Sequence, residues 1–135
     1  MKSHLALALA VMASMCAPAQ TTRPDPEEKA LIGDWRGDSI CVVRPSACRD
    51  EKALYRIKTG SQPNHFSVEG DKIVNGQAVN MGTSDCAYSP REHTLTCELP
   101  RGVIHLTLEG ARLEGNMKLT DGTLWRNITL KKDSA

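Results

Sequence analysis

Aromatic residues and net charge are both scarce in this chain. One Phe, two Tyr and two Trp are the only aromatic residues among 135, so the sequence lacks the stacking platforms on which single-stranded nucleic acids bind. The formal net charge is only +1, which leaves no basic surface for phosphate backbones or anionic membranes. We therefore expect no nucleic-acid partner.

The motifs of common catalytic and metal sites are missing as well. There is no Gly-x-Ser-x-Gly turn, and no Ser or Cys stands in a recognisable setting beside a His. No two cysteines have the C-x-x-C spacing of a zinc site. The adjacent carboxylates Glu27-Glu28 and Asp50-Glu51 fall in expected loops, where we interpret them as solvated. The histidines at 65, 93 and 105 fall at a strand start, in a turn and on a polar strand face, and we interpret them as solvated too. We expect no enzyme, no catalytic residue, no metal and no cofactor.

A single long apolar run lies at the N-terminus. Leu5–Met15 is too short to span a bilayer with ease, and small residues (Ala-Pro-Ala) follow at 17–19. Residues 1–19 are therefore interpreted as a secretory signal peptide that is removed after Ala19. The alternative is a lipoprotein signal with lipidation at Cys16, which lacks the small residue wanted just before the cysteine. We expect export to the bacterial periplasm or the extracellular space, and no membrane span.

Removing the leader leaves four cysteines and a balanced charge. Cys16 and Lys2 leave with it, so five cysteines become four and the 17 basic residues become 16, equal to the 16 acidic ones. An even number of cysteines in a small exported domain implies disulfide bonds.

From Asp34 onward the sequence is organised for β-structure. Turn residues recur about every eight to twelve positions, and the residues between them alternate with a period of two, as in all-β sandwiches and barrels. Consecutive hairpins without long crossovers favour a single antiparallel up-and-down barrel of about eight strands. The segments that we expect as strands are Asp34–Val43, Lys52–Thr59, His65–Glu69, Lys72–Val74, Ser84–Ser89, Thr94–Leu99, Val103–Glu109, Arg112–Leu119 and Leu124–Lys131.

One face of the expected sheet is apolar. In Val103–Glu109, for example, the even positions are Ile, Leu and Leu, whereas the odd ones include His and Thr. Closing the sheet into a barrel buries this face and removes the edges. The barrel domain is assigned to residues 32–135, after a polar and flexible lead-in at 20–31 that includes one helical turn at Glu27–Leu31.

Gly33-Asp34-Trp35, at the start of the first expected strand, resembles the Gly-x-Trp motif of the calycin superfamily, which contains lipocalins, fatty-acid-binding proteins and avidins. The resemblance implies that Trp35 lies across the closed end of the barrel under a basic residue of the last strand. In a closed antiparallel barrel the first strand begins where the last one ends, so Lys132 is the residue expected over Trp35 as a cation–π contact. Other stretches resemble small exported bacterial proteins of no assigned activity, which imply no site.

Hairpin register predicts one of two disulfides. Pairing the strands on either side of Pro90–His93 places Cys86 opposite Cys97, and directly opposed residues lie about 4.5 to 5.5 Å apart at Cα, within disulfide range. Cys41 and Cys48 then pair by elimination and close the loop after the first strand. We expect each bridge to stabilise the fold by roughly 2 to 3 kcal/mol.

The last expected strand carries a charge in its apolar register. Arg126 shares its parity with Leu124, Ile128 and Leu130, so it points inward, where an unpaired charge is costly. Fatty-acid-binding proteins are similar here, and the resemblance implies that Arg126 receives a ligand carboxylate. The alternative is that Arg126 reaches the solvated rim or pairs with an internal acid.

The expected function is binding of a small apolar or anionic-apolar ligand inside the barrel. Arg126, Tyr55 and Phe66 are the candidate ligand-binding residues, and the expected cavity lining is Tyr55, Ile57, Phe66, Leu106, Met117 and Ile128. The alternative function is an exported protein-interaction module, such as a hydrolase inhibitor that acts through the Cys41–Cys48 loop. The sequence leaves the oligomeric state open.

Overall fold

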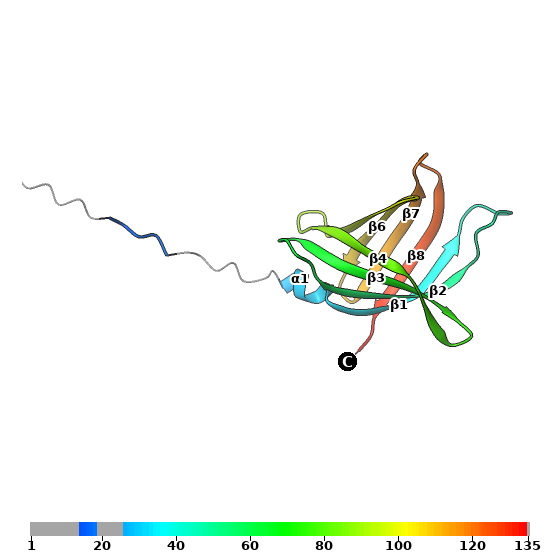
Figure 1. Ribbon diagram of the computed structural model, residues 1–135, viewed down its shortest axis with the longest axis horizontal. Helices are drawn as coiled ribbons and strands as arrows, with labels where there is room; N and C mark the ends of the chain where they lie inside the picture. Colours follow the sequence, from blue (N-terminus) through cyan, green and yellow to red (C-terminus); the bar gives the residue numbers. More distant parts are fainter. Residues whose placement is uncertain (1–13, 19–25, 135) are drawn as a thin grey trace, which may run out of the picture.

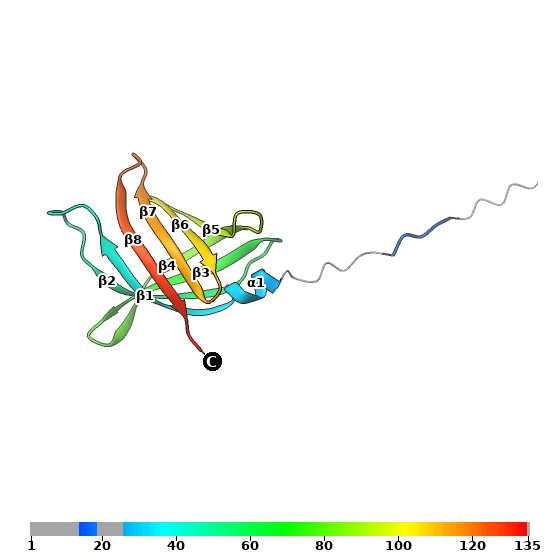
Figure 2. The same ribbon diagram turned by 180° about the vertical axis from the view of Figure 1, so that it is seen from behind.

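In the computed structural model, which describes residues 14–18 and 26–134, one short helix precedes eight antiparallel strands (Figure 1). Each strand pairs with the next and β8 pairs with β1, so the sheet closes as the expected up-and-down barrel, seen from behind in Figure 2. The elements are α1 (Pro26–Leu31), β1 (Gly33–Cys41), β2 (Glu51–Thr59), β3 (His65–Val74), β4 (Gln77–Ser89), β5 (Thr94–Leu99), β6 (Gly102–Glu109), β7 (Arg112–Leu119) and β8 (Leu124–Lys132).

The predicted cleavage site after Ala19 and the lead-in up to residue 25 lie outside the described residues. Cys16 is described and is an exposed, free cysteine. Within 14–18 and 26–134, no helix combines the length and the apolarity needed to cross a membrane.

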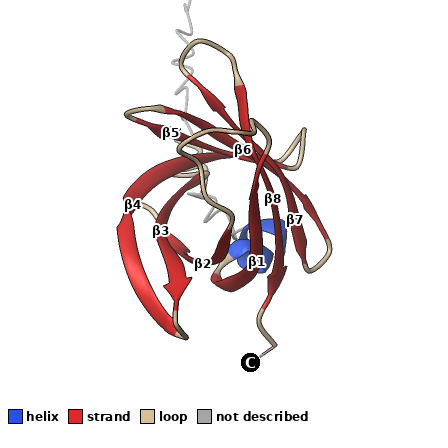
Figure 3. Cartoon of the chain, turned by 90° about the vertical axis from the view of Figure 1, so that its right-hand side faces the viewer, coloured by secondary structure: helices blue, strands red, loops and turns tan. Residues whose placement is uncertain are grey.

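Helix α1 and Trp35 close one end of the barrel, with α1 next to β1 (Figure 3). Leu31 and Trp35 are fully buried, and Trp35 Nε1 donates a hydrogen bond of 2.8 Å to the carbonyl of Leu31. Lys132 Nζ donates to the carbonyl of Ala30 at 2.7 Å and lies 5.8 Å from the centre of the Trp35 ring. These two side chains satisfy carbonyls that the helix itself leaves unpaired. Lys132, and not Arg126, is therefore the basic residue over Trp35, and α1 is part of the packed domain.

The closed half of the barrel is filled with apolar side chains. Phe66 and Tyr88 pack edge to face, with ring centroids 6.3 Å apart. Around them lie buried aliphatic side chains from the remaining strands, among them Ile57, Leu95, Leu106, Leu108, Leu113 and Leu130. This cluster forms the core next to α1, and the largest cavity described below lies toward the other end of the barrel.

Both predicted disulfides are present. Cys86 and Cys97 are opposed in the β4–β5 ladder with their Cα atoms 4.4 Å apart, so the predicted register is confirmed. Cys41 and Cys48 are joined with a Cα separation of 5.9 Å. The second bridge holds the loop that leads from β1 to β2.

The strand prediction was wrong at Gly70-Asp71 and at residues 77–83. The expected turn at Gly70-Asp71 does not exist, because β3 continues through it to Val74 with a β-bulge in its pairing with β4. Asp71 is only 2% exposed; its carboxylate accepts hydrogen bonds from Arg56 and, at 3.1 Å, from Asn80 Nδ2. Asp71 is thus a buried ion-pair partner, and β4 begins seven residues earlier than expected, at Gln77.

Candidate functional site

The end of the barrel opposite α1 contains a cavity of about 480 Å³. Every strand except β3 contributes to its wall, and the exposed residues Met81 and Arg101 lie where it meets solvent. The lining residues are Ser39, Glu51, Tyr55, Met81, Leu99, Pro100, Arg101, Ile104, Met117, Arg126 and Ile128. We call this space the large lobe.

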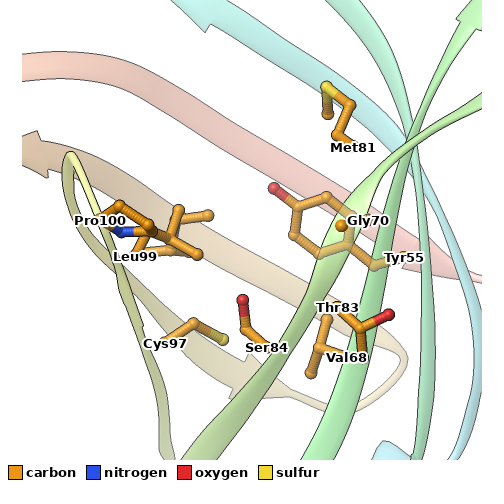
Figure 4. A pocket seen from close by; sticks show the side chains of 11 residues that line it. Tyr55, Val68, Gly70, Met81, Thr83, Ser84, Cys97, Leu99 and Pro100 are labelled. Carbon is orange, nitrogen blue, oxygen red and sulfur yellow. The ribbon is translucent and has the colours of Figure 1, made fainter.

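A second space of about 320 Å³ adjoins the large lobe and shares Tyr55, Met81, Leu99, Pro100 and Ile104 with it. It extends between β4 and β5 and is also lined by Val68, Gly70, Gly82, Thr83, Ser84 and Cys97, many of which Figure 4 shows. We call it the side lobe. The two lobes together leave the open half of the barrel unfilled.

Arg126 lies in the wall of the large lobe and is already bonded there. Its side chain is 14% exposed, and that of its ion-pair partner Glu51 is 19% exposed, with Arg126 Nη2 3.4 Å from Glu51 Oε1. Arg126 Nη1 donates to the carbonyl of Arg49 at 2.9 Å and to the carbonyl and hydroxyl oxygens of Ser39 at 3.3 Å each. This is the arrangement in which Arg126 pairs with an internal acid, and it compensates the cost of the partly buried charge.

Tyr55 lines both lobes. Figure 4 shows its ring among the residues that line the side lobe. Burial, and secondly the nearby Glu51 carboxylate, raise the pKa of its hydroxyl to about 12, against a smaller opposite effect of Arg126. The hydroxyl is therefore protonated at physiological pH. Its oxygen forms no hydrogen bond with another residue in the described part of the chain, so it can donate one to a ligand.

Phe66 does not share the cavity with Tyr55 and Arg126. Its ring packs on Tyr88 in the closed half, and it borders a separate surface pocket of about 270 Å³ beside α1. Ile57 and Leu106 are also fully buried away from both lobes. The expected lining was therefore wrong for these three residues, because alternation assigns a side chain to the inner face but does not give its height along a barrel of tilted strands.

Sequence reasoning missed several residues of the site. Glu51 was interpreted as a solvated loop carboxylate, but β2 begins at Glu51 and directs it into the cavity. Its inward direction could have been predicted from the sequence, because Glu51 has the same parity as the inward residues Tyr55 and Ile57. Met81 could not have been found in this way, since it belongs to the part of β4 that the sequence did not predict.

The three histidines among the described residues lie away from the cavity. His65 Nδ1 is 3.0 Å from Asp85 Oδ2, His105 Nδ1 is 2.9 Å from Thr96 Oγ1, and His93 Nδ1 is 2.9 Å from the carboxylate of Glu27. Residues 14–18 and 26–134 contain no group of three or more side chains that could hold a metal ion. Chemically, the two lobes offer an apolar wall, the Tyr55 hydroxyl, the hydroxyl-bearing residues Ser39, Thr83 and Ser84, and the internal Arg126–Glu51 pair.

No protein-family model matches the chain, and no curated protein matches it either. Function has to be argued from these residues.

Proposed function

We propose that this protein is an exported barrel that binds a small, largely apolar ligand in its open half. The observation that carries the proposal is the contrast between the two halves: the closed half is filled, whereas the open half contains the large lobe of about 480 Å³. Small-molecule sites are commonly apolar cavities of about 300 to 1,000 Å³ with a few polar groups.

Export and calycin-like ancestry belong to the same proposal. Two disulfides in a small domain are typical of oxidising, extracytoplasmic compartments. Trp35 at the closed end beneath Lys132 is the arrangement that the Gly-x-Trp resemblance implies. The disulfides support export, and the packing of Trp35 supports the likeness to a group of barrels whose interiors hold ligands.

The Arg126–Glu51 pair decides which polar group of a ligand is preferred. A ligand carboxylate near Arg126 Nη2 would also lie near the Glu51 carboxylate, since the two side chains are 3.4 Å apart, and like charges at such distances repel. A neutral hydroxyl or carbonyl avoids this repulsion and can accept a hydrogen bond from Tyr55. In the native protein we therefore favour an apolar ligand with a neutral polar group over an anionic one.

Calorimetric titration with an aliphatic alcohol and the carboxylate of equal chain length tests this proposal. We expect the alcohol to bind more tightly to the native protein, and Glu51→Gln to raise the affinity for the carboxylate. Adding Arg126→Leu to that variant should abolish carboxylate binding, whereas the control Arg91→Leu, in an exposed turn at the other end, should change nothing. Failure of both ligands to bind the native protein would exclude the proposal.

One feature favours the alternative function, a protein-interaction module. The Cys41–Cys48 loop is braced by its disulfide and by Asp50, which accepts hydrogen bonds from Arg44 at 2.5 Å and from the backbone N–H of Cys41 at 2.9 Å. These two bonds, that from Arg44 first, hold the pKa of Asp50 below its usual value. Arg44 and Pro45, at the tip of the Cys41–Cys48 loop, are exposed, as in loops that enter a partner's cleft.

A panel of purified hydrolases tests this alternative. If the loop inhibits one of them, Arg44→Ala should relieve the inhibition, and the carboxylate and alcohol affinities of the barrel should stay the same. Inhibition that survives this substitution would show that the loop is not the acting surface.

A further inference from the structure

The ladder between β4 and β5 is much shorter than β4 itself. β4 begins at Gln77, but it pairs with β5 only from Cys86 to Ser89, whereas its other side pairs with β3 almost throughout. Beyond Cys86–Cys97 the two strands, which are labelled in Figure 3, are no longer paired. Among the described residues, no strand lies beside the outer edge of β4 from Gln77 to Asp85.

Charge explains why the ladder ends where it does. Extending the register by one step beyond Cys86–Cys97 would place Asp85 opposite Glu98, and like charges directly opposite each other destabilise a strand pair. Cys86 and Cys97 point inward, so the side chains of Asp85 and Glu98 point outward. The Asp85 side chain is 64% exposed and Glu98 is exposed. Two carboxylates therefore flank the outer side of the opening between the strands.

The free edge of β4 has the groups that a further strand needs. A Cα separation of 4.4 Å identifies Cys86–Cys97 as a non-hydrogen-bonded pair. The N–H and C=O groups of Asp85 and Thr83 consequently point to the β5 side, which is open beside them. Edge strands are usually protected by lysine, proline or other charges, yet Gln77–Ser84 contains none of these.

The inner side of the same opening is apolar. Behind it lies the side lobe of about 320 Å³, with Val68, Leu99 and Ile104 in its wall (Figure 4). Alternate side chains of a strand point to opposite faces of the sheet. A strand beside β4 would thus direct one side chain into the side lobe and its neighbour outward between Asp85 and Glu98.

We propose that a peptide segment of a partner protein pairs as an additional strand with the free edge of β4 at Thr83–Asp85. In this segment, basic and apolar residues alternate. The basic side chain lies between Asp85 and Glu98, and the apolar one enters the side lobe. A second copy of this chain fits less well, because Gln77–Asp85 contains no basic residue to balance the two carboxylates. The proposal goes beyond ligand binding in the large lobe and does not depend on Arg126 or Glu51.

The test uses the mature protein and a fluorescent peptide that alternates lysine and valine, capped at both ends. We expect measurable binding by fluorescence anisotropy, with slower amide exchange at Thr83 and Asp85. Because an opposite-charge pair across strands contributes at most about 1 kcal/mol, Glu98→Gln and Asp85→Asn should each weaken binding about two- to fivefold. Glu92→Gln, which removes an exposed acid at the other end of β4, should leave the affinity unchanged.

A peptide of the same sequence, N-methylated at alternate residues, separates strand addition from simple charge attraction, and it should not bind. Equal binding of the methylated peptide, no binding up to about 1 mM, or exchange protection on other strands would each overturn the proposal. So would dimerisation of the protein through β4. The Glu51→Gln/Arg126→Leu variant should bind the peptide normally, so failure of this proposal is distinguishable from failure of ligand binding in the large lobe.

Discussion

At the residue scale, two basic side chains of β8 have the same parity but different roles. Lys132 contacts the Trp35 ring and the carbonyl of Ala30 at the closed end. Arg126 lies six residues earlier, roughly 20 Å away at about 3.3 Å per residue, and pairs with Glu51 at the open end. Each of these two cationic groups points into the barrel at a place where oxygen atoms accept its hydrogen bonds. These bonds compensate the cost of the partly buried charge.

Tyr55 gives a prediction that belongs to one residue. Its pKa is raised from 10.0 to about 12, chiefly by burial, so the folded state retains a proton that the unfolded state loses. The corresponding stabilisation is fully present below pH 10 and is lost as the pH rises through about 12; the total loss is about 2 to 3 kcal/mol.

Urea unfolding of the native protein and Tyr55→Phe checks this prediction. The stability difference between them should change between pH 9 and pH 12, with the native protein losing more. A difference that stays constant over that range would contradict the burial of the hydroxyl.

At the element scale, α1 is held to the barrel by Glu27, whose carboxylate accepts a hydrogen bond from Tyr88 at 2.7 Å and lies 2.9 Å from His93 Nδ1. The hydrogen bond from Tyr88, and then that from His93, lowers the pKa of Glu27 from 4.5. The stability that these bonds contribute is present above the unfolded-state pKa of Glu27, and it is lost as the pH falls through the lower folded-state pKa. Acidification should therefore loosen α1.

Fluorescence of Trp35 in a Trp125→Phe background follows the docking of α1, since the Trp35 ring bonds to the helix. We expect the emission to shift to longer wavelength as the pH falls below about 4.5, and Glu27→Gln to show part of this shift already at pH 7. Emission that is independent of both pH and the substitution would show that Glu27 does not anchor the helix.

The Cys86–Cys97 bridge clamps the strand pair at the point where β4 and β5 separate. Replacing both cysteines by Ala should cost about 3 kcal/mol and lower the melting temperature by about 10 °C, without changing the β-type circular dichroism. Amide exchange should accelerate in the Cys86–Ser89 ladder. The matched Cys41→Ala/Cys48→Ala variant should lose comparable stability but leave exchange in that ladder unchanged; acceleration in both variants would contradict the clamp.

Sequence pattern predicted those elements whose register depends on neighbours in the chain. The hairpin around Pro90–His93 and its disulfide follow from counting residues outward from the turn. The bulge near Gly70 could not be predicted, because Asp71 is a common turn residue and its burial depends on Arg56 in another strand. Similarly, parity showed that Arg126 points inward, but its partner Glu51 lies 75 residues away.

At the scale of the whole molecule, the two ends of the barrel differ: one is packed around α1, and the other contains the two lobes. The helix, Trp35 and the aromatic pair fill the closed end, while the two disulfides hold the strands around the open end. The unfilled lobes there cost stability, since unfilled apolar space forfeits packing contacts. The central claim is that this space accepts a ligand.

The most direct test is one calorimetric titration of an aliphatic alcohol into the native protein and into Leu99→Trp. Leu99 lines both lobes, so a larger side chain there fills empty space instead of overpacking a core, which would cost about 1 to 3 kcal/mol. We predict that the native protein binds the alcohol with a negative heat-capacity change, and that Leu99→Trp unfolds at the same or a higher temperature but no longer binds. Identical binding heats for the two proteins would contradict the account.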